Sequence, residues 1–181
     1  LWNNGGSVEI RDCTFTANTA RNGGAIQNLE GAAPEMTGCL FQNNAATSAG
    51  GAIHSRDGSA VSLSRCRFLR NSATAAGGAM FTSASDLFVS DAAFSGNSAA
   101  SGGALQNFGS AATLINCTLS RNVAAGSGGG IVNLSSINPL QSCILWGNSD
   151  LFGTDESAQV AGDAPSVNHS CIQGWTGTFG G

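Results

Sequence analysis

One sequence unit recurs along this chain every 25 to 27 residues, and the repeat restricts the folds that the chain can adopt. Its first mark is a Gly-Gly doublet followed by small and apolar residues, which begins at Gly23, Gly50, Gly77, Gly102 and Gly129. Its second mark, Cys-x-apolar-x-x-Asn, begins at Cys13, Cys39, Cys66, Cys117 and Cys143, and Ala92 replaces the Cys in one further copy. Two motifs in the same phase predict a structure of stacked copies.

A unit of this length, with Gly, Asn and Ser turns, cannot bury its apolar face alone and must stack on its neighbours. Apolar residues five and three places before the Cys, such as Val61 and Leu63, alternate as they do in a strand. The framework of a leucine-rich repeat and the 3.6-residue periodicity of a helical repeat are both missing. The sequence therefore predicts an all-β fold, a right-handed parallel β-helix (a single-stranded β-solenoid) of about six coils.

We expect three strands in each coil, which in one coil cover residues 25–28, 34–36 and 39–41. Stacking in register converts each repeated position into a ladder. Two inward aliphatic and aromatic ladders are predicted: Ile26, Ile53, Met80, Leu105 and Ile131; and Phe15, Phe41, Phe68, Phe94, Leu119 and Leu145. An asparagine ladder is predicted at Asn18, Asn44, Asn71, Asn97, Asn122 and Asn148. A shorter polar ladder is predicted at Asn3, Asn28, Ser55, Thr82, Asn107 and Asn133.

The six cysteines invite a disulfide framework, but five of them occupy the same position in different coils. Parallel Cβ vectors in register suit the geometry of a disulfide poorly. We expect buried free thiols that act as small hydrophobic groups, and one or two bridges remain the alternative. Because Cys-x-x-Cys and His partners are missing, neither a metal site nor a cofactor is predicted.

The repeat also divides the chain. Residues 1–148 are expected to form the coils, residues 149–165 a protruding loop, and residues 166–181 a terminal coil and tail with a strand near residues 166–172. Residues 1–3 align with residues 26–28, inside a strand. We therefore expect a fragment that adjoins further coils of a longer parent chain.

The composition restricts the classes of partner that this chain is expected to bind. The chain has seven Arg and no Lys, with a formal net charge of −4, so a phosphate backbone would meet a mildly repulsive surface and nucleic acid is not expected. No apolar run approaches the roughly 18 residues of a membrane-spanning helix, so this segment is not expected to insert into a membrane.

The doublet units, such as residues 23–26, and the Phe-x-x-Asn units, such as residues 41–44, resemble the repeats of chlamydial polymorphic outer membrane proteins and of many bacterial right-handed β-helix proteins. The resemblance covers residues 1–148. Residues 143–148 and 167–174 resemble the final coils of secreted β-helix proteins with surface-sorting tails, called choice-of-anchor proteins. The resemblance implies an extracellular or cell-surface protein, an adhesin or a carbohydrate-associated module, and does not imply an enzyme.

Few of the residues expected to face outward are candidates for ligand binding or acid–base chemistry. Arg65, Arg67 and Arg70 lie on one coil and are candidates to grip a carboxylate or sulfate of an acidic glycan, with a solubilising patch as the alternative. His54 is expected to face outward beside Arg56 and Asp57, where acid–base work would need a carboxylate within reach. Phe81 follows in the same column one coil later and is a candidate to stack on a sugar ring.

No catalytic residue is predicted. The sequence favours a structural or adhesive β-helix module whose partner is a polysaccharide or a host or cell-surface glycan. Two alternatives stay open: a fragment of a polysaccharide lyase or glycoside hydrolase, and a glycan-binding module without turnover.

Overall fold

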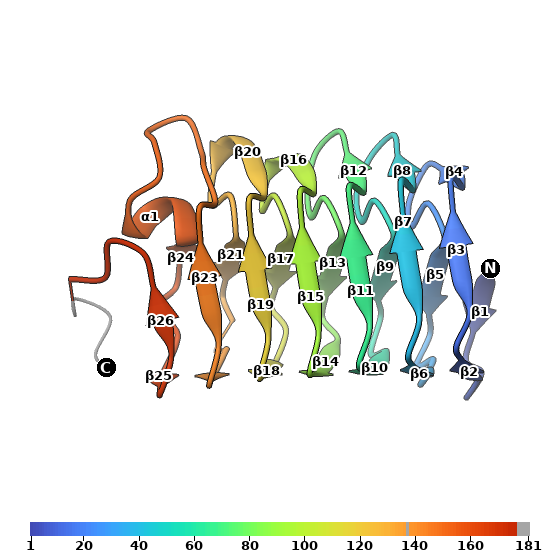
Figure 1. Cartoon of the computed structure of the whole chain (residues 1–181). Helices are drawn as coiled ribbons and strands as arrows, with labels where there is room; N and C mark the ends of the chain where they lie inside the picture. The colour runs from blue at the N-terminus through green and yellow to red at the C-terminus, as the bar shows by residue number, and fades with distance from the viewer. Residues whose placement is uncertain (137, 177–181) are drawn as a thin grey trace.

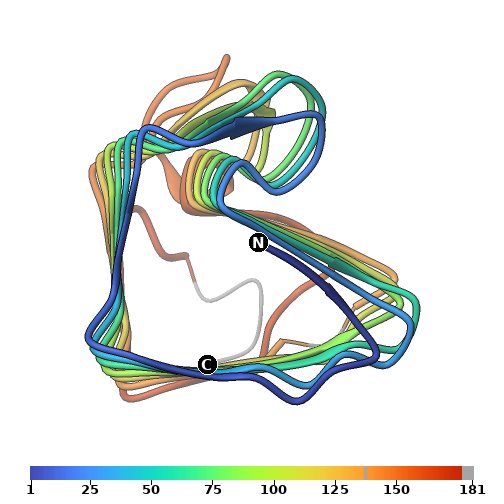
Figure 2. The ribbon, with the colours of Figure 1, turned by 90° about the vertical axis from the view of Figure 1, so that its right-hand side faces the viewer.

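In a computed structural model, which describes residues 1–136 and 138–176, the chain winds as a parallel β-helix. Seen from its N-terminal end, the ribbon turns clockwise as it recedes from the viewer, so the helix is right-handed (Figure 2). This is the handedness that parallel β-crossovers adopt almost without exception. The predicted fold class is confirmed, although three of the sheets contain seven strands rather than six.

The strands form four sheets that run along the rod, of which three contain seven strands and one contains five (Figure 1). Sheet A contains β1 (Trp2–Asn4), β5 (Ile26–Leu29), β9 (Ile53–Arg56), β13 (Met80–Ser83), β17 (Leu105–Phe108), β21 (Ile131–Leu134) and β24 (Val160–Gly162). Sheet B contains β2 (Glu9–Arg11), β6 (Glu35–Thr37), β10 (Ala60–Ser64), β14 (Asp86–Ser90), β18 (Ala112–Ile115), β22 (Leu140–Gln141) and β25 (Val167–Asn168).

Sheet C contains β3 (Thr14–Thr16), β7 (Leu40–Gln42), β11 (Arg67–Leu69), β15 (Ala93–Ser95), β19 (Thr118–Ser120), β23 (Ile144–Trp146) and β26 (Cys171–Ile172). Sheet D, which the sequence did not predict, contains β4 (Thr19–Ala20), β8 (Ala45–Ala46), β12 (Ser72–Ala73), β16 (Ser98–Ser101) and β20 (Val123–Ser127). Its strands are short and follow directly after the Asn ladder. No helix among the described residues is long and apolar enough to cross a membrane.

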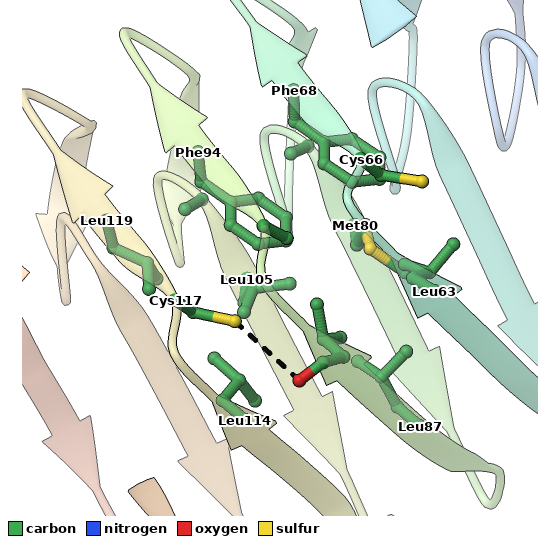
Figure 3. Packing of buried hydrophobic residues seen from close by; sticks show 14 of the residues in the cluster. Leu63, Cys66, Phe68, Met80, Leu87, Phe94, Leu105, Leu114, Cys117 and Leu119 are labelled. Atoms are coloured by element: carbon green, nitrogen blue, oxygen red, sulfur yellow. Dashed lines mark hydrogen bonds between the residues drawn. The ribbon is translucent and has the colours of Figure 1, made fainter. Parts of the chain in front are cut away.

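The predicted apolar ladders fill the core. The aliphatic series that begins at Ile26 is buried throughout, and so is the aromatic series except for the partly buried Phe15 in the first coil. The rings of Phe41 and Phe68 stack at 4.8 Å and those of Phe68 and Phe94 at 4.6 Å, both within 3° of parallel. These separations equal the spacing of neighbouring parallel strands, so in-register pairing itself produces the stack, part of which Figure 3 shows.

The asparagine ladder is also present, and its bonds follow one rule. Both the backbone N–H and the side-chain Nδ2 of each Asn donate to the Oδ1 of the Asn in the next coil, as Asn71 does to Asn97 at 2.9 and 3.0 Å. The same Nδ2 donates to a backbone carbonyl of the preceding coil, for example from Asn97 to Phe68 at 3.0 Å. The ladder therefore satisfies the buried backbone N–H groups, such as that of Asn71, which the bend between sheets C and D leaves outside the strand pairing.

The Gly-Gly doublets occupy a bend where the ribbon turns inward between sheets D and A (Figure 2). A Cβ on Gly51 would lie 2.0 Å from the carbonyl oxygen of Gly78 in the next coil and 2.5 Å from that of Ser72. Gly50 has a φ of +66°, and its Cβ would lie 2.2 Å from the carbonyl oxygen of Ile53. The close approach of neighbouring backbones thus requires the doublet.

Residues 149–165 differ from the predicted protruding loop. They contain helix α1 (Glu156–Gln159), capped by Asp155, and strand β24, which pairs with β21. Gln159 accepts a bond from Asn148 Nδ2 at 2.8 Å and returns one to the Asn148 carbonyl at 3.0 Å. A glutamine on a helix thus takes the place of the next Asn, and only the part before α1 extends from the rod (Figure 1).

All six cysteines are free thiols. Cys39, Cys66, Cys117 and Cys143 are buried in the ladder position, where Ala92 is also buried. Each buried thiol donates a weak bond to a backbone carbonyl, as Cys117 does to Val89 in Figure 3. Cys13, which we expected to be buried with them, is exposed because it belongs to the first coil of the stack. Cys171 is also exposed.

The ladder predicts an unequal response to two asparagine substitutions. Asn97→Ala leaves the Asn71 N–H buried without an acceptor and removes the bonds from Asn97 Nδ2 to the Phe68 carbonyl and to Asn122 Oδ1, so we expect the free energy of unfolding to fall by about 3 kcal/mol. Asn168→Ala removes an exposed side chain and should change stability by less than about 0.5 kcal/mol. Urea titration followed by circular dichroism measures both, and equal effects would contradict the ladder.

The thiols should fall into two classes. Burial shields four of the thiols from a reagent in solution, and it raises the pKa of one of them, Cys66, to about 11. We expect iodoacetamide at pH 8 to modify only Cys13 and Cys171 rapidly in the folded protein, and all six thiols in urea without reductant. Mass spectrometry counts the adducts, and fewer than six in urea would reveal a disulfide.

Candidate ligand-binding faces

The three arginines predicted as a cluster are all exposed, but they point away from different parts of the coil. Arg65 lies at the bend between sheets B and C, Arg67 on the outer face of sheet C, and Arg70 at the bend that follows. Strand β11 of sheet C thus carries Arg67 on its outward side, and Arg65 and Arg70 lie just beyond its two ends.

Arg70 shares a surface cavity with a second arginine, Arg121, which was not a sequence-based candidate. Arg70 and Arg121 line one surface cavity of about 410 Å³ together with Gln42, Leu69, Ser95 and Gly96. We call this cavity the arginine groove. Arg121 occupies the same bend position as Arg70 two coils later, each directly before an Asn of the ladder. The repeated Arg-Asn dipeptide in phase with the ladder was the available signal.

The outer face of sheet C is devoid of acidic side chains. Its two outward columns read Thr14, Leu40, Arg67, Ala93, Thr118, Ile144 and Cys171; and Thr16, Gln42, Leu69, Ser95, Ser120, Trp146 and Gln173. Trp146, 55% exposed, adds an aromatic surface one coil beyond Arg121. In a chain with a net charge of −4, this face therefore combines positive charge with hydroxyl, amide and indole groups.

His54 corrects one expectation. It lies on the outward side of sheet A, but it is only 6% exposed. Its ring stacks on Phe81 at 5.2 Å, and Gln27 is its partner in the preceding strand. The inward bend at Gly50 brings backbone against it, since a Cβ there would lie 3.0 Å from the His54 Cα. Phe81 is itself half-buried, so this pair offers little surface to a sugar ring.

The surroundings of His54 keep it neutral. Burial, together with the nearby Arg56 guanidinium, lowers its pKa to about 4, and Asp57 acts in the opposite direction. Its Nδ1 is buried, without a hydrogen-bond partner among the described residues. A neutral, covered imidazole is poorly suited to exchange protons with a ligand at the surface.

A second cavity, of about 340 Å³, lies on the outer face of sheet B. Phe88, 44% exposed, and Asp86 project there from β14, between the hydroxyl-bearing Ser62 and Thr113 of the neighbouring coils. An exposed ring beside a carboxylate and hydroxyl groups can contact a sugar. Neither residue was a sequence-based candidate, because nothing in the repeat distinguishes them.

Within residues 1–136 and 138–176, no group of three or more His, Cys, Asp or Glu side chains is arranged to hold a metal ion. Glu9 and Glu35 are neighbours in sheet B, and Glu9 pairs with Arg11 as Asp57 does with Arg56.

Known proteins resemble this chain at the level of the fold. A family model described as a right-handed β-helix region matches residues 1–172. The chain matches no curated protein and no solved structure.

The lowered pKa of His54 predicts a pH-dependent stability. The unfolded chain takes up a proton near pH 6.5 and the folded chain only near pH 4, so stability falls as the pH drops through this window and is unaffected above it. The full loss is about 3 kcal/mol. We expect His54→Gln, which copies Gln27 and Gln106 of the same column, to remove this part of the dependence.

Urea titrations at pH 7 and pH 4.5 measure the effect. The control is His169→Gln, because His169 is exposed. If His54→Gln kept the full pH dependence, the assignment to His54 would be wrong.

Proposed function

This chain belongs to the right-handed β-helix family, and from that premise we propose that it serves as a rigid structural and adhesive module of an extracellular or cell-surface protein. The observation that carries the proposal is that the inward and outward sides of the coil differ in what they do. The inward positions form ladders of apolar side chains and of asparagine hydrogen bonds, whereas the outward positions of sheets B and C form broad faces with cavities. Function belongs to such faces rather than to the fold.

The rigidity of the solenoid supports the proposed structural role. Seven strands in each of three sheets, an asparagine ladder and a phenylalanine stack run along the same axis. A solenoid of this kind holds its surface residues at fixed intervals of about 4.8 Å along the rod. Contacts with an extended partner therefore lose little additional conformational entropy on binding.

Adhesion is supported by the chemistry of the outward faces. Arginine, serine, glutamine and tryptophan side chains on sheet C can contact hydroxyl and acidic groups of glycans, and Phe88 and Asp86 on sheet B can contact neutral sugars. Glycan binding without turnover is thus the form of adhesion that we favour. A lyase or glycoside hydrolase would need an exposed acid–base residue, and the burial of His54 argues against the histidine that was considered for that role.

An experiment with two readouts tests the proposal. The purified chain is applied to a glycan array that contains neutral and acidic polysaccharides, and is also incubated with pectin and alginate while absorbance of unsaturated products is monitored. We expect saturable binding and no product. Robust product release would favour the enzyme alternative, and failure to bind any glycan would contradict the adhesive role.

A further inference from the structure

Arginine and glycine alternate along one edge of the rod. The bend that follows sheet C places one residue of each coil directly before the Asn ladder: Ala17, Asn43, Arg70, Gly96, Arg121 and Gly147. The buried ladder holds the backbone of this bend in register. The backbone that carries the two arginines is therefore fixed by the hydrogen bonds of the asparagine ladder.

Each arginine side chain runs along the rod toward the following coil. A Cβ on Gly96 would lie 3.6 Å from Arg70 Cγ, and a Cβ on Gly147 would lie 3.9 Å from Arg121 Cγ. The glycines thus leave space beside the arginine stems, and the arginine groove extends from Gln42 to Arg121 over consecutive coils. Ser95, between the two arginines, adds a hydroxyl group.

The charge of these arginines is not neutralised locally. Ion pairs in residues 1–136 and 138–176 join Arg11 to Glu9 and Arg56 to Asp57. Arg70 and Arg121 take part in none of them, and the outward columns of sheet C contain no Asp or Glu. A guanidinium group is well suited to bind a carboxylate or sulfate through two parallel hydrogen bonds.

The spacing of the pair limits the ligand. Arg70 and Arg121 are two coils apart, which corresponds to about 10 Å along the rod at the spacing of parallel strands. A sugar residue of an extended polysaccharide advances by about one coil height. Acidic groups on alternate sugars would therefore meet successive arginines, while the intervening sugar lies over Ser95.

Building on the adhesive role proposed above, we propose that the arginine groove binds a linear acidic polysaccharide that carries a carboxylate or sulfate on every second sugar. The chain of sugars lies along the rod, and Ser95 and Gln42 donate to or accept from its hydroxyl groups. Trp146 extends the same face beyond Arg121 and stacks on a further sugar ring.

Three polysaccharide probes separate the possible ligands in a titration at physiological salt. Hyaluronan carries a carboxylate on alternate sugars, κ-carrageenan carries a sulfate on alternate sugars, and dextran is neutral. We expect binding of hyaluronan, of κ-carrageenan or of both, with dextran at least tenfold weaker because charge-assisted hydrogen bonds are worth roughly this much. The stronger of the two acidic probes identifies the preferred anion.

Variants place the binding at the groove. Arg70→Gln and Arg121→Gln should each weaken binding about tenfold, and the double variant about a hundredfold. Arg56→Gln removes the same charge at a different position, where Arg56 pairs with Asp57, and should change affinity less than twofold. Gly96→Asn fills the space beside Arg70 with a residue that Asn43 shows to be accepted at this bend, and should also weaken binding. Urea midpoints verify that each variant is folded.

The outcomes separate this inference from the proposed function. Loss of acidic-polysaccharide binding in the double variant, with binding by Arg56→Gln retained, supports the groove. Unchanged binding by the double variant, or binding of dextran as tight as that of the acidic probes, overturns the groove while the adhesive role stands. Failure of the wild-type chain to bind any polysaccharide overturns both.

Discussion

Hydrogen bonding in register between consecutive coils is the constraint on which every other feature of this rod depends. In the strands, backbone groups pair directly with the next coil; at the bend after sheet C, the asparagine ladder replaces them. Each Asn joins three coils, because its Oδ1 accepts from the coil before and its Nδ2 donates both to a carbonyl of that coil and to the Asn of the next. A shift of register in one coil would break these bonds in both directions. Register also places Phe over Phe and Cys over Cys, so core packing follows from the same constraint.

A fixed register has consequences for the outside of the molecule. Outward residues from different coils are held at regular intervals, so two residues far apart in sequence can act together without a loop to bring them near. The arginine groove arises in this way, because Arg70 and Arg121 occupy the same bend two coils apart. Glycine at the intervening positions has a role different from that of the Gly-Gly doublets. The doublets permit backbones to approach, whereas Gly96 and Gly147 leave room beside side chains.

At the end of the coil stack, the asparagine ladder is continued by a residue that is not an asparagine of the repeat. After Asn148 the repeat is interrupted, yet α1 positions Gln159 so that its amide makes the bonds that another Asn would have made. Strand β24 then rejoins sheet A with Val160 in the aliphatic ladder. What the ladder requires is an amide at this place, and a helix can supply it as well as the bend of a coil.

The sequence alone was sufficient for the inward positions that repeat from coil to coil. Ile26, Phe41, Cys66 and Asn97 could be assigned to ladders because each recurs with the same phase, and recurrence is visible in a single chain. The outward half was different. Tertiary structure decided that Arg70 lines a cavity with Arg121 and that His54 is covered. On the inward side it also decided that Gln159, which lies outside the repeat, continues the asparagine ladder. The physical reason is that inward positions must repeat to stack, whereas outward positions are free to vary, and their grouping depends on register, bend geometry and side-chain direction that no repeat records.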